Sequence, residues 1–146
     1  IQFGADFLAG TPDWGFEINE LKLDTGETYK GHITLGHTDG VAMAIGDAVA
    51  FMLTSPAGQR RVEYVSGPTN RPAVICAGGT NFVLLMACPA ELAYVKCDDA
   101  ADAGDHIIHS ASNGIATTTN TPTAFTSFGV CLESKGAGGK AKVGAA

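Results

Sequence analysis

The sequence predicts an all-β protein, a compact antiparallel β-barrel or sandwich of short strands with an extended N-terminal arm. Apolar and polar residues alternate with a period of two in many short segments, whereas no long segment has the 3.6-residue period of a helix. Clusters of Gly, Pro, Asn and Ser separate these segments at short intervals. The chain has 146 residues, 45% of them hydrophobic, which is enough for one domain with a core.

Residues 1–14 are predicted to be the arm. Their sequence, IQFGADFLAGTPDW, contains large apolar side chains but no alternation. Two interpretations remain open, because the segment could pack over its own domain or grip a neighbouring subunit. In the second case aromatic side chains are the natural anchors, since buried aromatics dominate interfaces. The candidate subunit or capsid interface residues are Phe3, Phe7, Leu8 and Trp14.

A β-hairpin is predicted over residues 15–36. In its first strand, GFEINELKL, Phe16 and Ile18 share one face, and the later leucines fall out of phase, which indicates a bulge near Asn19–Glu20. The segment DTGE forms the turn, where Gly26 is free to take a positive φ. The returning strand, TYKGHITLG, places on one face Tyr29, Gly31, Ile33 and Leu35.

Nine further short strands are predicted, which makes residues 15–146 a single β domain. Turn sequences such as SPAGQ, AGGT, SNG and KGAGG separate them. The segment 97–105, CDDAADAGD, could hold one helical turn. The predicted strands cover residues 47–54, 60–66, 72–77, 81–87, 92–97, 105–110, 114–119, 127–134 and 140–145.

Two of these strands begin with the same dipeptide. AIGDAVAFM (44–52) and DAGDHIIHS (102–110) align at Gly46 and Gly104 and at the aspartates that follow. A glycine allows a turn before the strand, and the Asp carboxylate can accept hydrogen bonds from nearby backbone N–H groups. This similarity between the two segments indicates either two related β units or chance.

The glycine-rich segment GAGGKA (136–141) raises the question of phosphate binding. A dinucleotide loop must open a helix within a βαβ unit, but only seven residues follow Gly139. A Walker A loop needs a glycine where Ser134 stands and a Ser or Thr after Lys140. A hairpin turn between the last two strands is therefore predicted.

No catalytic, metal or cofactor site is predicted. His106 and His109 would point to opposite faces of a strand, and Asp98, Asp99, Asp102 and Asp105 do not have the spacing of a calcium loop. No nucleophile elbow or HExxH motif is present, so enzyme activity and a cofactor are not expected. The four cysteines lack zinc spacing and are expected to be buried free thiols: Cys76, Cys88, Cys97 and Cys131.

Charge and hydropathy limit the partners. The net charge is −6, and residues 1–59 carry eight acids against Lys22 and Lys30. Without a basic patch, direct binding of nucleic acid is not expected. The longest apolar run without proline, 82–88, is far shorter than the ~20 residues that span a bilayer, and the first residues do not resemble a signal peptide, so no membrane partner is expected.

The C-terminal part resembles the tailed-bacteriophage capsid decoration proteins, also called cement or head-stabilising proteins. The resemblance extends over residues 41–146 and is carried by DAGDHIIHSASNGIATTTN and FTSFGVCLESKGAGGKAKVGAA. In that family a Gly-Asp strand start leads to an NG-type turn, a strand of the form xGxALE, an Ala/Gly-rich turn and a final strand. Here Cys131 replaces the small residue usual in the xGxALE strand.

This resemblance implies a structural virion protein. Such a protein would be assembled in the host cytoplasm, lie on the outer surface of the virion, and stabilise the expanded icosahedral capsid. Its partners would be the major capsid protein and two further copies of itself, because the family forms homotrimers at three-fold or quasi-three-fold positions. Two alternatives remain open, another virion β protein such as a tail-tube subunit, and a carbohydrate-binding β-sandwich module.

Overall fold

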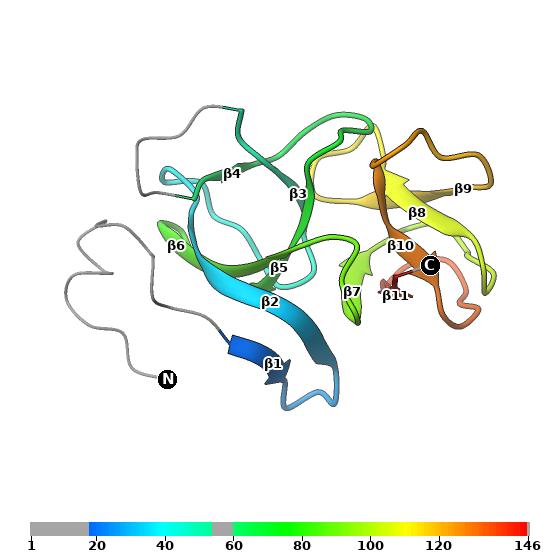
Figure 1. Ribbon diagram of the computed structural model, residues 1–146, viewed down its shortest axis with the longest axis horizontal. Helices are drawn as coiled ribbons and strands as arrows, with labels where there is room; N and C mark the ends of the chain where they lie inside the picture. The colour runs from blue at the N-terminus through cyan, green and yellow to red at the C-terminus, as the bar shows by residue number, and fades with distance from the viewer. Residues whose placement is uncertain (1–17, 54–59, 146) are drawn as a thin grey trace.

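A computed structural model describes residues 18–53 and 60–145 of the chain. These residues form eleven β-strands in two sheets, and they contain no helix (Figure 1). All neighbouring strands within the sheets are antiparallel. The all-β class predicted from the period-two alternation is therefore confirmed.

The first sheet contains the strands of the N-terminal half, in the order β1-β2-β6-β5-β3-β4. The hairpin expected near the start is present as β1 and β2, and its register shifts between Ile18 and Glu20, where the sequence indicated a bulge. Gly26 in the hairpin turn has a φ of 94°. The strands are β1 (Ile18–Lys22), β2 (Thr28–His37), β3 (Ala48–Phe51), β4 (Val62–Glu63), β5 (Pro72–Ala77) and β6 (Phe82–Ala87).

The second sheet has the order β7-β11-β10-β8-β9. Its strands are β7 (Ala93–Lys96), β8 (His106–His109), β9 (Ala116–Thr119), β10 (Ser127–Cys131) and β11 (Lys140–Gly144). The helical turn that the sequence allowed at 97–105 does not form. The backbone of Ala101 instead exchanges two hydrogen bonds with the backbone of Lys135, of 3.1 and 2.8 Å. Its N–H and carbonyl groups are therefore bonded to a distant segment and not to neighbouring residues, as they would be in a helical turn.

The two sheets repeat one topology. The strands β2 to β6 have the spatial order β2-β6-β5-β3-β4, and β7 to β11 have the order β7-β11-β10-β8-β9. Adding five to each strand number of the first set gives the second. We call β2–β6 the first unit and β7–β11 the second unit. The hairpin strand β1 is an addition to the edge of the first unit.

Neither unit is a closed barrel. In the first unit, a single parallel bridge joins His37, at the end of β2, to Arg61, before β4. In the second unit, a parallel bridge joins Cys97 to Ala116 in the corresponding way. Each unit therefore curls until the strands at the two ends of its spatial order meet at one bridge, and no continuous ladder of hydrogen bonds closes it.

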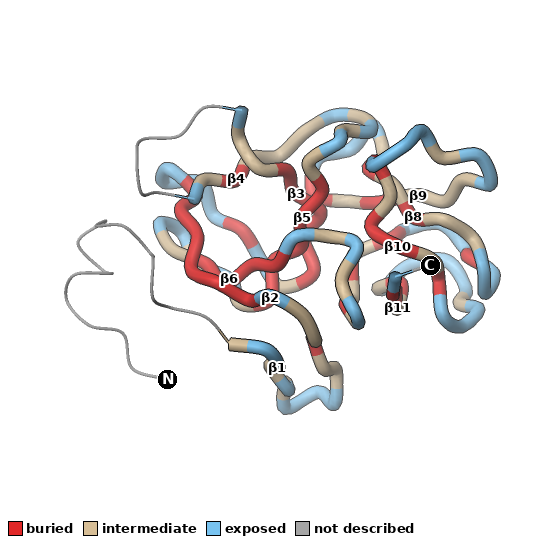
Figure 2. Tube along the Cα trace, in the orientation of Figure 1, coloured by how far each residue is buried: buried red, intermediate tan, exposed pale blue. Residues whose placement is uncertain are grey.

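The main hydrophobic cluster contains side chains from both units. Tyr29, Ile33 and Met86 of the first unit and Val95 and Phe128 of the second belong to it, and all five are fully buried. Figure 2 shows buried backbone running through the central strands of both sheets. A smaller cluster, which includes Val49 and Leu85, lies within the first unit. The two units thus share one continuous apolar core.

Candidate functional site

The two Gly-Asp turns have the same geometry. Gly46 and Gly104 have φ angles of 88° and 97°, which favour glycine. In the first turn the Asp47 carboxylate accepts a 2.8 Å hydrogen bond from the backbone N–H of Ala44, three residues earlier. In the second turn the Asp105 carboxylate accepts the equivalent bond of 2.9 Å. The predicted role of this dipeptide, a turn that opens a strand, is confirmed.

The surroundings of the two aspartates differ. Asp47 is buried, and its carboxylate lies 2.6 Å from the Lys96 ammonium and accepts a 2.5 Å hydrogen bond from the Tyr64 hydroxyl. Burial, followed by the hydrogen bond to Asp47, raises the pKa of Tyr64. Lys96 belongs to the second sheet, so this carboxylate joins the two units. Asp105, in contrast, is only half-buried.

A second ion pair also links the units. The Lys140 ammonium on β11 lies 2.9 Å from the Glu27 carboxylate in the turn between β1 and β2, and both side chains are about three-quarters buried. Neither this pair nor the pair of Asp47 with Lys96 was predicted, because the partners lie far apart in the sequence. Both arrangements hold the fold together and bring no nucleophile beside a base.

The glycine-rich segment near the C-terminus is a hairpin turn, as predicted. The strands on either side of it, β10 and β11, pair with Cys131 opposite Val143. Gly138 and Gly139 have φ angles of 81° and 73°. The N–H of Gly138 donates to the carbonyl of Asp98, so this group is used inside the fold.

The two histidines of β8 lie on opposite faces, as predicted. His106 is half-buried, whereas His109 is buried against the Phe128 ring, with ring centroids 4.6 Å apart. His109 Nε2 lies 2.9 Å from the carbonyl oxygen of Val49, and this oxygen can only accept. The Nε2 atom therefore carries the proton, and Nδ1 has no hydrogen-bond partner.

The acidic cluster on the loop after β7 makes local hydrogen bonds. Asp99 accepts from the Thr117 hydroxyl, and Asp105 accepts from the backbone N–H of Asp102. Within residues 18–53 and 60–145, no three His, Cys, Asp or Glu side chains are grouped as metal ligands would be. The cluster therefore serves to fix the loop in this part of the chain.

The cysteines are free thiols, as expected. Three are buried, Cys88 is half-buried, and none of the four forms a disulfide. Burial raises the pKa of Cys76, and it raises the pKa of Cys88 to about 12. Burial also raises the pKa of Cys97. Thiols with raised pKa values are protonated at neutral pH and are poor nucleophiles.

Exposed apolar side chains are the main candidates for contact with another protein. Phe125 is 83% exposed and has a φ of 65°, which is unusual for a bulky residue. The Thr126 N–H and hydroxyl both donate to the carbonyl of Thr123, and these bonds hold the loop between β9 and β10. Sequence alternation could not identify Phe125, because the residue lies outside any strand. Within residues 18–53 and 60–145, the other exposed large apolar residues are Val41, Leu53 and Leu132.

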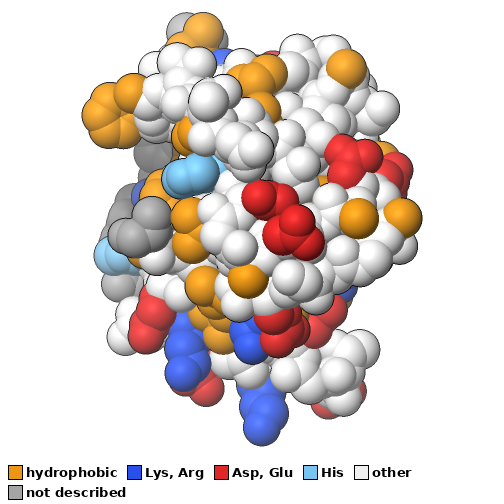
Figure 3. All heavy atoms as spheres, turned by 90° about the vertical axis from the view of Figure 1, so that its right-hand side faces the viewer, with side chains coloured by type: hydrophobic (Ala, Val, Ile, Leu, Met, Phe, Trp, Pro, Cys, Tyr) orange, Lys and Arg blue, Asp and Glu red, His pale blue; other side chains and the backbone are white. Residues whose placement is uncertain are grey.

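The side of the molecule that carries the second unit has a mixed surface (Figure 3). Hydrophobic and acidic side chains are scattered over this side, and most of its visible Lys and Arg side chains lie towards the lower end. Surfaces that expose apolar side chains among polar ones are compatible with contact to another protein.

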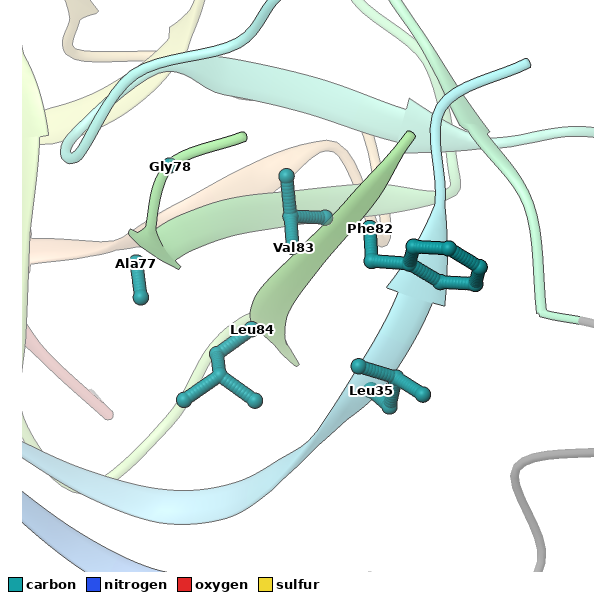
Figure 4. Close-up of a pocket in the computed structure, with 6 residues that line it drawn as sticks. All are labelled: Leu35, Ala77, Gly78, Phe82, Val83 and Leu84. Atoms are coloured by element: carbon teal, nitrogen blue, oxygen red, sulfur yellow. The ribbon is translucent and has the colours of Figure 1, made fainter. Parts of the chain in front are cut away.

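The first unit has a larger and a smaller hollow that are lined entirely by described residues. The larger, of about 330 Å³, lies beside β4 and is lined by apolar residues such as Met43 and Val62 together with Asp39 and Glu63. The smaller, of about 100 Å³, is lined mainly by apolar side chains of β2, β5 and β6 (Figure 4). Neither hollow contains a catalytic constellation of the kinds considered above.

The four residues proposed as interface anchors from the sequence, Phe3, Phe7, Leu8 and Trp14, lie outside the described residues. The described part of the chain contains no helix long and apolar enough to cross a membrane. No protein-family model matches the chain, and no curated protein sequence matches it.

Proposed function

We propose that this chain is a structural virion protein that binds the outer surface of an expanded icosahedral phage capsid and stabilises it as a homotrimer. The observation that carries the proposal is the resemblance of residues 41–146 to capsid decoration proteins. In the structure, the residues that carry this resemblance form the Gly-Asp turns and the hairpin of β10 and β11. The geometry supports the pattern of short strands and turns on which the resemblance depends.

The charge of the molecule supports an external position. A chain with a net charge of −6 is repelled by nucleic acid, so the outside of a shell suits it better than the inside, which faces packaged genome. The low fraction of charged residues, 16%, suits a protein that covers part of its surface with other subunits.

The protein would act by thermodynamic linkage, in which binding stabilises one state of the capsid, and not by catalysis. A protein that binds only the expanded lattice stabilises that lattice by mass action. A trimer that touches several capsomers gains avidity, so no single contact has to be tight. Among the described residues, Phe125 is the best candidate anchor, because its side chain is 83% exposed on a loop held by two hydrogen bonds from Thr126 to the carbonyl of Thr123. Phe3, Phe7, Leu8 and Trp14 remain candidates in the arm.

The proposal is tested by co-sedimentation of the chain with purified heads of its virus, before and after shell expansion, with the bound copies counted. We expect saturable binding to expanded heads only, with copy numbers in multiples of three. Binding to neither form would exclude the capsid proposal and favour the tail-tube and carbohydrate-binding alternatives.

A variant tests the role of Phe125 in the same assay. Replacing Phe125 with Ser should weaken binding to expanded heads about tenfold or more, since truncation of a central aromatic anchor commonly costs about 2 kcal/mol. The matched control is Val41→Ser, another exposed apolar residue, on the first unit. Equal affinities of Phe125→Ser and the unchanged chain would remove Phe125 from the interface.

A further inference from the structure

Apolar side chains of the first sheet form rows across its strands. Residues opposite each other in antiparallel strands place their side chains on the same face. The β1 residue Ile18 packs against the main core at the end of one such row, and the other four members are fully buried. The members of this row, from β1 across to β3, are Ile18, Ile33, Met86, Val74 and Ala48.

The next row is incomplete at the edge of the sheet. It contains Leu35, Leu84 and Ala77, which lie opposite one another on β2, β6 and β5. Within the described residues, β1 begins at Ile18, opposite Ile33, and therefore supplies no partner for Leu35. The smaller hollow is lined by these three side chains together with Phe82, as Figure 4 shows.

The first residue of β1 lies opposite Ile33, two residues before the Leu35 that lines this hollow. β1 is antiparallel to β2, with Lys22 opposite Thr28 and Ile18 opposite Ile33. Continuing the ladder by two residues towards the N-terminus brings position 16 opposite Leu35. That position is Phe16, and it shares the parity of Ile18 in a segment where apolar and polar residues alternate. A strand continued in this register would direct the phenyl ring to the face that carries Leu35 and Leu84.

We propose that this hollow is the binding site for the side chain of Phe16 of the same chain, which completes the second row. The hollow of about 100 Å³ is mostly apolar and smaller than the enclosed cavities of about 150 Å³ that accept a benzene ring, but it is open to the surface, so part of a phenyl ring can project from it. The occupant comes from the same chain because only Glu17 separates Phe16 from Ile18, which already pairs with the chain's own β2. Two residues span at most about 7 Å.

A Phe16 side chain bound in the hollow would determine where the arm leaves the domain. If Phe16 occupies the hollow, residues 1–14 start from the edge of the first unit, beside the ends of β2 and β6. The remaining apolar residues of the arm, such as Phe3 and Phe7, stay available for a neighbouring subunit. The inference does not rest on the proposed capsid function, because it concerns the free protein and needs no head.

A direct test is solution NMR of the full chain, with labelled Leu methyl groups and Phe rings. We expect nuclear Overhauser effects between the Phe16 ring and the methyl groups of Leu35 and Leu84, and we expect them to be independent of protein concentration. Effects to another aromatic ring, such as Trp14, or no effect at all, would overturn the assignment. In a mixed sample of labelled and unlabelled chains, effects between different molecules would assign the hollow to a second copy and would also overturn it.

Thermal unfolding gives a second, independent readout. Phe16→Ala should lower the Tm by about 3–8 °C, because a seated ring is lost. Phe7→Ala is the matched control, since it removes the same side chain from the arm, and it should shift the Tm by less than about 1 °C. Equal shifts in the two variants would contradict the proposal.

Discussion

His109 is a buried base with one ring nitrogen bonded to Val49 and the other without a partner. Burial lowers the pKa of its imidazole below the ordinary 6.5, in spite of the hydrogen bond to Val49. Protonation would place an unpaired N–H and a charge in the apolar core. The unfolded chain therefore takes up this proton at a higher pH than the folded chain does, and His109 lowers the free energy of unfolding as the pH falls below 6.5.

The first prediction concerns this pH dependence. Between about pH 7 and pH 5, the free energy of unfolding of His109→Gln should fall less than that of the unchanged chain, by up to about 1.4 kcal/mol per unit of pKa difference. The measurement is urea unfolding at the two pH values. The control is His106→Gln, on the other face of β8. If both variants keep the pH slope of the unchanged chain, His109 is not the group responsible.

Asp47 and Asp105 occupy equivalent turns in different environments, so the stability effect of the same substitution can be compared at the two sites. Asp47→Asn removes the charge partner of Lys96, and we expect it to lower the free energy of unfolding by about 2–3 kcal/mol. Asp105→Asn, the matched control, affects mainly the turn bond to Asp102 and should cost about 1 kcal/mol or less. Urea unfolding of both variants measures the difference. Equal losses would show that the contact of Asp47 with Lys96 contributes nothing to the free energy of unfolding.

Residues that act within a turn could be predicted from the sequence, whereas residues that act between units could not. The role of Gly46 with Asp47 follows from local backbone chemistry, since the bonded N–H is three residues away. The ion pair of Asp47 with Lys96 joins positions that are 49 residues apart. Such a contact depends on the packing of two sheets, and residue types and short spacings contain no information about it.

The strands themselves followed from the sequence because each is a short alternating segment bounded by turn residues. The strand predicted at 72–77 has those bounds in the structure. The strand predicted at 60–66 is shorter, because only Val62–Glu63 pairs with β3. Alternation reports which face a residue occupies, but it does not report how many residues find a partner strand.

Gly129 in β10 is a position within a strand where the backbone geometry leaves no room for a side chain. Its φ is 131°, and a Cβ atom there would lie 2.3 Å from the carbonyl oxygen of Gly144 on β11. Gly129→Ala should therefore strain the pairing of these strands and lower the free energy of unfolding by about 1–3 kcal/mol. Gly136→Ala is the control, because a Cβ at that position meets no atom within 4 Å. Chemical unfolding distinguishes the two, and a harmless Gly129→Ala would contradict the observed geometry.

At the scale of the whole molecule, the repeated topology was only hinted at by the sequence. The two Gly-Asp dipeptides mark equivalent strand starts, β3 in the first unit and β8 in the second. Strand order could not be derived, because period-two alternation is the same whichever strand lies next to another. The arrangement of each unit, in which the first strand pairs with the last, emerges only when the chain folds back on itself.

Two units of one topology could unfold separately or together, and the shared core favours unfolding together. Fully buried residues of both units, such as Val74 and Val143, belong to one apolar cluster, and two ion pairs link the sheets. If one unit unfolded alone, it would expose the apolar face of the other to water, at a cost of about 25 cal/mol per Å².

We therefore predict a single unfolding transition in urea. The methyl resonances of Val74 in the first unit and Val143 in the second, followed by NMR, should disappear at the same midpoint and with the same slope. Asp47→Asn, which weakens one link between the units, should lower both midpoints together. Separate midpoints in the unchanged chain would show that the units are independent folding elements, and the shared cluster would then be a contact between two stable bodies.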